Sequence, residues 1–202
     1  MGKGQKYVSE FTGSEGITAQ SEAALANFGL TLDDIIPVAV PSITSGVKAI
    51  NEGRAKGVSV SLGTSAVTEF DAQKGARFLS FDPSPEAVAR MQDKYPGTLV
   101  QVEPSPDNIG IKEPTYLMCY DFYLVSRVDL SDELAYQVVK SIWDNNEELT
   151  SINFPLKDWT TENFLVQDFT IPFHPGAIKF YQEKGVWTPE MEQRQQELSK
   201  VS

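Results

Sequence analysis

Apolar segments and helix-forming segments alternate over about the first 80 residues, and this alternation limits the possible fold more than any other feature. A repeated strand–helix order is typical of a largely parallel sheet covered by helices, so the predicted fold class is α/β. The expected strands lie at 7–11, 35–40, 58–62 and 78–81, and the expected helices between them at 17–28, 42–52 and 63–73.

Each predicted helix of this region begins at or just after a small, hydroxyl-rich turn, and these turns lie at 12–16, 41–44 and 63–65. Parallel sheets place ligands at the carboxyl ends of their strands, where all three turns are expected. Glycines allow close approach to the backbone, and free N–H groups at a helix start favour an anion. The candidate ligand-binding residues are Gly13, Ser14, Gly16, Thr18, Ser42, Gly63, Thr64 and Ser65.

Each turn taken alone could equally be an ordinary capped strand–helix turn. The glycine spacing at 13–16 fits neither a P-loop nor a dinucleotide fingerprint. Three such turns on one predicted edge favour a pocket of neutral donors for a small polar ligand.

The second half of the chain is organised differently. Prolines are frequent between residues 82 and 114, where a short helix and extended segments are expected to approach an interlobe crossover. We therefore divide the chain into a central α/β lobe, 1–113, and a return strand with closing helices, 114–202. The expected elements after residue 82 are a helix at 84–95, a strand at 115–126, and helices at 131–148, 175–184 and 189–200.

Charge and cysteine content exclude several classes. The formal net charge of −11 opposes binding to nucleic acid or to an anionic bilayer. The single cysteine, Cys119, cannot form an internal disulfide, and its apolar surroundings predict a buried structural thiol. No apolar stretch approaches the about 18 residues of a transmembrane helix, and the first residues carry no apolar signal core.

His174 is the only histidine, and it lies between Phe173 and Pro175 at a predicted helix start. A structural hydrogen bond is favoured there over a role as general base or ligand. One histidine and one cysteine give no zinc spacing and no Ser-His-Asp arrangement. We expect no metal, no cofactor and no enzymatic activity.

Several stretches together resemble a known family. They are Ile171-Pro172-Phe173-His174-Pro175-Gly176-Ala177 with the following Phe180 to Gly185, the opening Gly4 to Val8, Asn27 to Asp34, and Leu124 to Leu130. These segments are similar to the TAXI subfamily of solute receptors for tripartite ATP-independent periplasmic (TRAP) transporters, over nearly the whole chain.

This resemblance implies a type II periplasmic-binding fold, in which two α/β lobes close on a small ligand. It also implies a periplasmic location, membrane transporter subunits as partners, and a ligand such as glutamate, another amino acid or a carboxylate. The family's Gly-Ser-Gly-Thr turn maps onto Gly13 to Thr18, where this chain has a longer turn containing Glu15.

Family members carry another lobe-forming stretch before the position where this chain starts. We therefore expect an incomplete pocket and some exposed lobe surface. The consequence is either weak ligand binding or pairing with another chain that covers the gap, and a homo-oligomer would provide such a chain. Three alternatives stay open: a cytoplasmic ligand-sensing domain, an enzyme on a related α/β fold, and a degenerate domain with an interaction role only.

Overall fold

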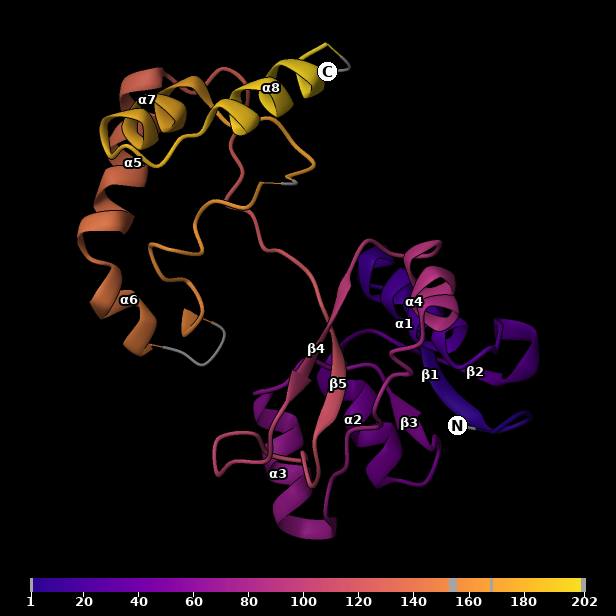
Figure 1. Cartoon of the computed structure of the whole chain (residues 1–202). Helices are drawn as coiled ribbons and strands as arrows, with labels where there is room; N and C mark the ends of the chain where they lie inside the picture. The colour runs from indigo at the N-terminus through magenta and orange to yellow at the C-terminus, as the bar shows by residue number, and fades with distance from the viewer. Residues whose placement is uncertain (1, 153–155, 168, 201–202) are drawn as a thin grey trace. The chain divides into compact units, whose positions relative to one another are not determined.

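The structure is a computed structural model that describes residues 2–152, 156–167 and 169–200. The chain divides into two compact units, Met1–Phe122 and Tyr123–Ser202 (Figure 1). Each unit has its own buried cluster of apolar side chains. The predicted division into lobes after residue 113 stays a prediction.

The first unit is built on a parallel sheet of three strands in the order β2-β1-β3. The mixed α/β class predicted from the sequence is thus confirmed. The strands are β1 (Lys6–Phe11), β2 (Ile36–Val40) and β3 (Gly57–Val58), and the intervening elements are α1 (Glu15–Asn27), the 3₁₀ helix η1 (Leu32–Asp34), α2 (Ile43–Asn51) and, after β3, α3 (Ser65–Lys74).

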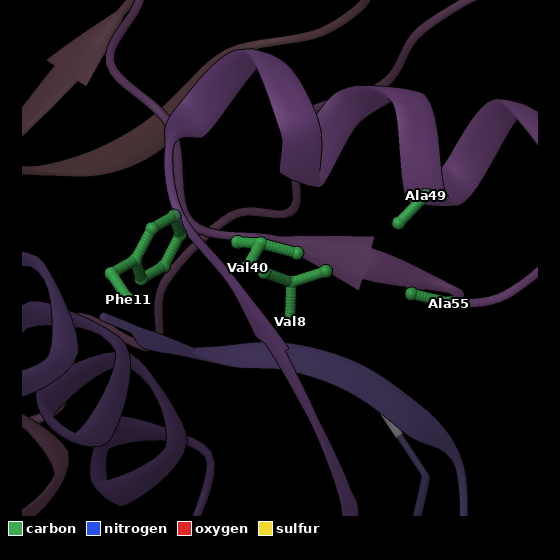
Figure 2. Packing of buried hydrophobic residues seen from close by; sticks show 5 residues of the cluster. All are labelled: Val8, Phe11, Val40, Ala49 and Ala55. Atoms are coloured by element: carbon green, nitrogen blue, oxygen red, sulfur yellow. The ribbon is translucent and has the colours of Figure 1, made fainter. Parts of the chain in front are cut away.

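The central strand β1 supplies the core on both faces of the sheet, because neighbouring residues of a strand point to opposite faces. Tyr7 packs with Leu25 of α1, together with Leu30 and Ile35. Val8 belongs to the opposite cluster beneath α2, in which Ala49 points from the helix toward the sheet (Figure 2). The members of this cluster are Val8, Phe11, Val40, Ala49 and Ala55.

Gly46 lets α2 approach the sheet closely. A Cβ at this position would lie 2.8 Å from Val58 Cγ2 and 3.3 Å from Val8 Cγ1. Because Tyr7 packs with α1 and Val8 with α2, these two helices cover opposite faces of the sheet. The α3 helix packs beside α2.

The rest of the first unit is α4 (Pro85–Gln92) and an antiparallel pair, β4 (Thr98–Val102) with β5 (Thr115–Cys119). The α4 helix packs along α1. Arg90 of α4 donates to the carbonyl oxygens of Ala26 and Asn27 at 3.0 and 2.9 Å, which satisfies carbonyls at the end of α1.

The second unit contains α5 (Asp132–Asp144), α6 (Asn146–Ile152), α7 (Pro175–Glu183) and α8 (Pro189–Leu198). Its core lies between α5 and α7 and is rich in aromatic rings. Phe180 is 2% exposed and meets Tyr136 and Trp143 edge to face. The ammonium of Lys184 lies over the Trp143 ring, 5.6 Å from its centroid, and covers this cluster.

Three expected strands differ from the sequence-based prediction. The strand expected at 58–62 is limited to β3, because the chain turns away at Ser61, whose carbonyl accepts from Thr64 Oγ1. Residues 78–81 form no ladder and make isolated bonds, from Phe78 N to Gly110 O and from Phe81 N to Tyr116 O. The strand expected at 115–126 ends at Cys119, which is paired with the first residue of β4.

Two further predictions need correction. The helix expected at 131–148 is interrupted at Asn145, whose side-chain amide donates to Ser141 O, so that α5 ends and α6 begins. Cys119 is exposed rather than buried, because it lies at the end of a ladder of two strands.

Candidate functional site

The turn between β1 and α1 is held by a serine cap. Ser14 is the N-cap of α1: its Oγ accepts from Ile17 N at 3.4 Å, and its own N–H donates to Phe11 O at 3.0 Å. The capping bond uses the hydroxyl oxygen as an acceptor, so the Ser14 hydroxyl can donate its proton to a ligand. Gly13 and Gly16 beside it are exposed.

Thr18 holds the same turn from inside. Its Oγ1 accepts from Phe11 N at 3.0 Å and donates to Ser14 O at 3.4 Å. Both bonds join the end of β1 to the first turn of α1. In this geometry Thr18 positions the turn, and its hydroxyl proton is already used.

The turn after β2 lies against the turn after β1. Thr12 N donates to Val40 O at 3.0 Å, and a Cβ on Gly13 would lie 2.9 Å from Pro41 O. Ser42 caps α2 by accepting from Ser45 N at 3.2 Å. Only glycine at position 13 allows the two turns to approach this closely, so two of the predicted turns are brought together.

The turn after β3 depends on a left-handed residue. Gly63 has φ +79°, a conformation that residues with a Cβ adopt at a cost. Thr64 Oγ1 donates to Ser61 O at 2.7 Å and closes the turn. Ser65, the first residue of α3, is exposed, and the first N–H groups of α3 have no intrahelical partner.

A buried tyrosine fixes the chain that leads into this third turn. The hydroxyl groups of Tyr7 and Ser59 are 2.8 Å apart. Burial raises the pKa of Tyr7, so the phenol stays neutral. Gly57 lies against the Tyr7 ring, since a Cβ there would be 2.9 Å from Cε2. The start of this loop is thereby tied to the central strand.

The strand order separates the turns after β1 and β3 from the turn after β2. After β1 the chain leaves for α1 on one face of the sheet, and after β3 it leaves for α3, which packs with α2 on the other face. The carboxyl ends of β1 and β3 therefore flank a topological switch point, the usual ligand position in open α/β sheets. Ser14 precedes α1 after β1 and Ser65 opens α3 after β3, whereas Ser42 follows β2, on the other side of β1.

The donors at this edge are electrically neutral. No lysine, arginine or histidine occurs in the turn segments 12–18, 41–46 and 61–67. Glu15, the first residue of α1, is exposed and carries the one charge within these segments. Backbone N–H groups and hydroxyls at helix starts suit a polar or anionic ligand group.

Sequence reasoning missed Ser9 of β1. The register between β1 and β2 shifts between Val8 and Glu10, so Ser9 is the extra residue of a bulge. Its Oγ is fully buried and has no hydrogen-bond partner within the described residues. Bulges re-aim the end of a strand, here just before the Ser14 turn. Period-two hydrophobic patterns carry no signal for such a bulge.

The single histidine lies outside the parallel sheet and its turns. His174 is the N-cap of α7 in the second unit, with Nδ1 accepting from Gly176 N at 3.2 Å, in keeping with the structural role predicted for it. Within residues 2–152, 156–167 and 169–200, no three metal-ligating side chains come together. In the same residues, no helix is both long and apolar enough to cross a bilayer.

Comparison with known proteins adds the family. No curated protein sequence matches the chain significantly. The sequence profile of the NMT1-like family matches residues 7–185, which include the parallel sheet except Lys6, the three turns and α7. Members of this family are binding proteins with a periplasmic-binding-protein-like fold, and the parallel α/β unit described above is of that type. The chain therefore belongs to the NMT1-like family.

Proposed function

We propose that this chain is the extracytoplasmic solute-binding subunit of a TRAP transporter. It captures a small polar ligand, a carboxylate or an amino acid such as glutamate, and delivers it to membrane subunits. Membership of a binding-protein family supports the solute-binding part and agrees with the expectation that the chain is not an enzyme. The segment around His174 to Ala177 supports the assignment to the TAXI receptors.

One observation supports the proposal: α1 follows the carboxyl end of β1 and α3 follows that of β3, and these two strand ends flank the switch point. Each helix start offers N–H groups without an intrahelical partner. The positive ends of both helix dipoles favour negative charge at this edge. A carboxylate is a common metabolite group that can accept from several such donors at once.

Hydroxyl groups that already donate within the turns are not available to a ligand, so the remaining donors are the candidates for contact. Thr18 and Thr64 use their hydroxyl protons within the turns. Ser14 and Ser65, with the N–H groups of the residues that follow them, offer donors for a ligand. We assign recognition to Ser14 and Ser65 and turn geometry to Gly13, Thr18, Gly63 and Thr64, with Gly16 leaving room beside the first turn.

Exposed apolar side chains support a protein partner. At the start of the second unit, Val128 is 99% exposed, and Leu124 and Val125 are also exposed. Side chains of this kind in succession are typical of surfaces that another chain covers. This agrees with pairing to a membrane subunit or to a second copy.

A thermal-shift screen of amino acids, dicarboxylates and oxo-acids tests the proposal. A compound that binds only the folded chain raises the melting temperature, and the rise grows with the logarithm of its concentration once this exceeds the dissociation constant. We expect a dose-dependent shift with a carboxylate and none with its amide. A cooperatively folded sample that responds to no compound would contradict the proposal.

The same exposed residues favour one alternative, an interaction domain that retains the fold without a working pocket. This alternative predicts a stable oligomer and no saturable binding of small ligands. Sedimentation velocity together with the screen distinguishes the two functions.

A further inference from the structure

The single histidine joins the starts of two helices in the second unit. His174 Nε2 lies 3.0 Å from Leu130 O, just before the Ser131 cap of α5. His174 Nδ1 accepts from Gly176 N at 3.2 Å, which caps α7. The imidazole therefore links the chain that enters α5 to the first turn of α7.

These two partners determine the protonation state of the ring. A carbonyl oxygen can only accept and a backbone N–H can only donate, so Nε2 must carry the proton and Nδ1 must be bare. The neutral Nε2–H tautomer satisfies both bonds. A second proton on Nδ1 would point at the Gly176 N–H and abolish the cap.

The contact between the helix starts leaves little room for adjustment. A Cβ on Gly176 would overlap the backbone carbonyl of Asp132, so α7 begins directly against α5. The His174 side chain is 16% exposed, which permits protonation from solvent. An imidazolium at this position would also face the positive end of the α7 dipole.

One charged group is placed to accept a hydrogen bond from a protonated Nδ1. Asp132 Oδ1 of α5 lies 3.7 Å from His174 Nδ1. In the loop before α5, Arg127 and Asp129 are paired with each other at 2.9 Å. From α8, the neutral amide of Gln195 bonds to Phe173, and the ammonium of Lys179 on α7 lies over the Tyr136 ring.

We infer that His174 is a proton-sensitive cap, which loosens the start of α7 when Nδ1 takes a second proton. Protonation transfers Nδ1 from the Gly176 amide to the Asp132 carboxylate, and the first turn of α7 loses its cap.

Amide hydrogen exchange of the whole chain tests this inference. Between about pH 7.5 and pH 5.5, the range in which histidines titrate, protection at Gly176, Ala177 and Ile178 falls about tenfold beyond the intrinsic pH effect, as expected for a lost N-cap. His174→Asn provides the matched control, since asparagine caps helices and does not titrate. Equal pH dependence in both proteins would overturn the inference.

A second measurement does not depend on a variant that folds. Because the chain has one histidine, ¹⁵N spectra of its imidazole report on His174 alone. The inference requires the Nε2–H tautomer at about pH 8, where a histidine is neutral. A dominant Nδ1–H tautomer would overturn it. Asp132→Asn should leave the tautomer unchanged and reduce the loss of protection on acidification, because the carboxylate that stabilises the imidazolium is absent. An undiminished loss would contradict the role given to Asp132.

Discussion

The side-chain amide of Asn27 and the backbone of Asp82 hold each other by two hydrogen bonds. Asn27 Nδ2 donates to Asp82 O at 3.0 Å, and Asn27 Oδ1 accepts from Asp82 N at 2.8 Å. Asn27 is the last residue of α1 and is 1% exposed. This pair fastens the chain that leads into α4 to the end of α1.

Substitution of this asparagine should destabilise the first unit. Asn27→Ala leaves two backbone groups of Asp82 without partners, and we expect a loss of about 2–3 kcal/mol in the free energy of unfolding. Asn51 is the matched control, because it is the last residue of α2 and is exposed. Urea denaturation should show Asn51→Ala within about 0.5 kcal/mol of the wild type. Equal losses in the two variants would contradict the role of the Asn27–Asp82 pair.

Gly176 should not tolerate a side chain. The added methyl group of Gly176→Ala would overlap the Asp132 carbonyl, and backbone cannot yield as a side chain does, so we expect a cost of about 3 kcal/mol. Gly16 occupies the same second position of α1, where a Cβ would meet only Ser14 Oγ at 3.8 Å. Thermal unfolding should therefore place Gly16→Ala near the wild type and Gly176→Ala far below it.

Asp71 should contribute to loss of stability in acid. Ala76 N donates to Asp71 Oδ1 at 2.6 Å, and this bond holds the pKa of Asp71 below its usual range. A lowered pKa in the folded state gives stability above the ordinary value of about 3.9, and this stability is lost as pH falls through the folded pKa.

Asp71→Asn tests this contribution, since the amide oxygen can still accept from Ala76 N but does not titrate. We expect its stability to fall less than that of the wild type between about pH 5 and pH 3. Glu69→Gln, at an exposed position of the same helix, controls for loss of a carboxylate. If the pH dependence of Asp71→Asn matches that of Glu69→Gln, the Ala76 bond is not the cause.

Glu15 should weaken the binding of an anionic ligand. Its carboxylate lies at the start of α1, where a bound carboxylate is also proposed to lie. Removing one exposed charge near a helix end changes such interactions by about 0.3–1 kcal/mol, so Glu15→Gln should bind about two- to fivefold tighter. Glu22→Gln, farther along α1, should bind as the wild type does. Unchanged affinity in Glu15→Gln would place the ligand elsewhere.

Local signals in the sequence were sufficient for part of the parallel sheet. The strand β2 and the helix α2 follow from short-range patterns of apolar and capping residues, and the structure has them close to the expected bounds. Similarly, Gly63 was predicted at a turn, and its positive φ gives the physical reason for a glycine there.

Short-range patterns could not predict contacts between residues that are far apart in the sequence. The Asn27–Asp82 pair spans 55 residues and the His174–Leu130 contact spans 44. The exposure of Cys119 follows from the end of a two-stranded ladder, which the apolar run around it does not reveal. The role of Thr18 also depends on the folded geometry, because only the turn brings its hydroxyl to Phe11 N.

Isothermal titration with the best carboxylate from the screen tests the central claim most directly. The wild type should bind saturably, and Ser14→Ala should bind about tenfold or more weakly, because a hydrogen bond to a charged group is lost. Ser131→Ala is the matched control: Ser131 caps α5 by accepting from Leu134 N at 3.3 Å, as Ser14 caps α1. Affinity that is unchanged in Ser14→Ala, or equally reduced in Ser131→Ala, would contradict a carboxylate site between the carboxyl ends of β1 and β3.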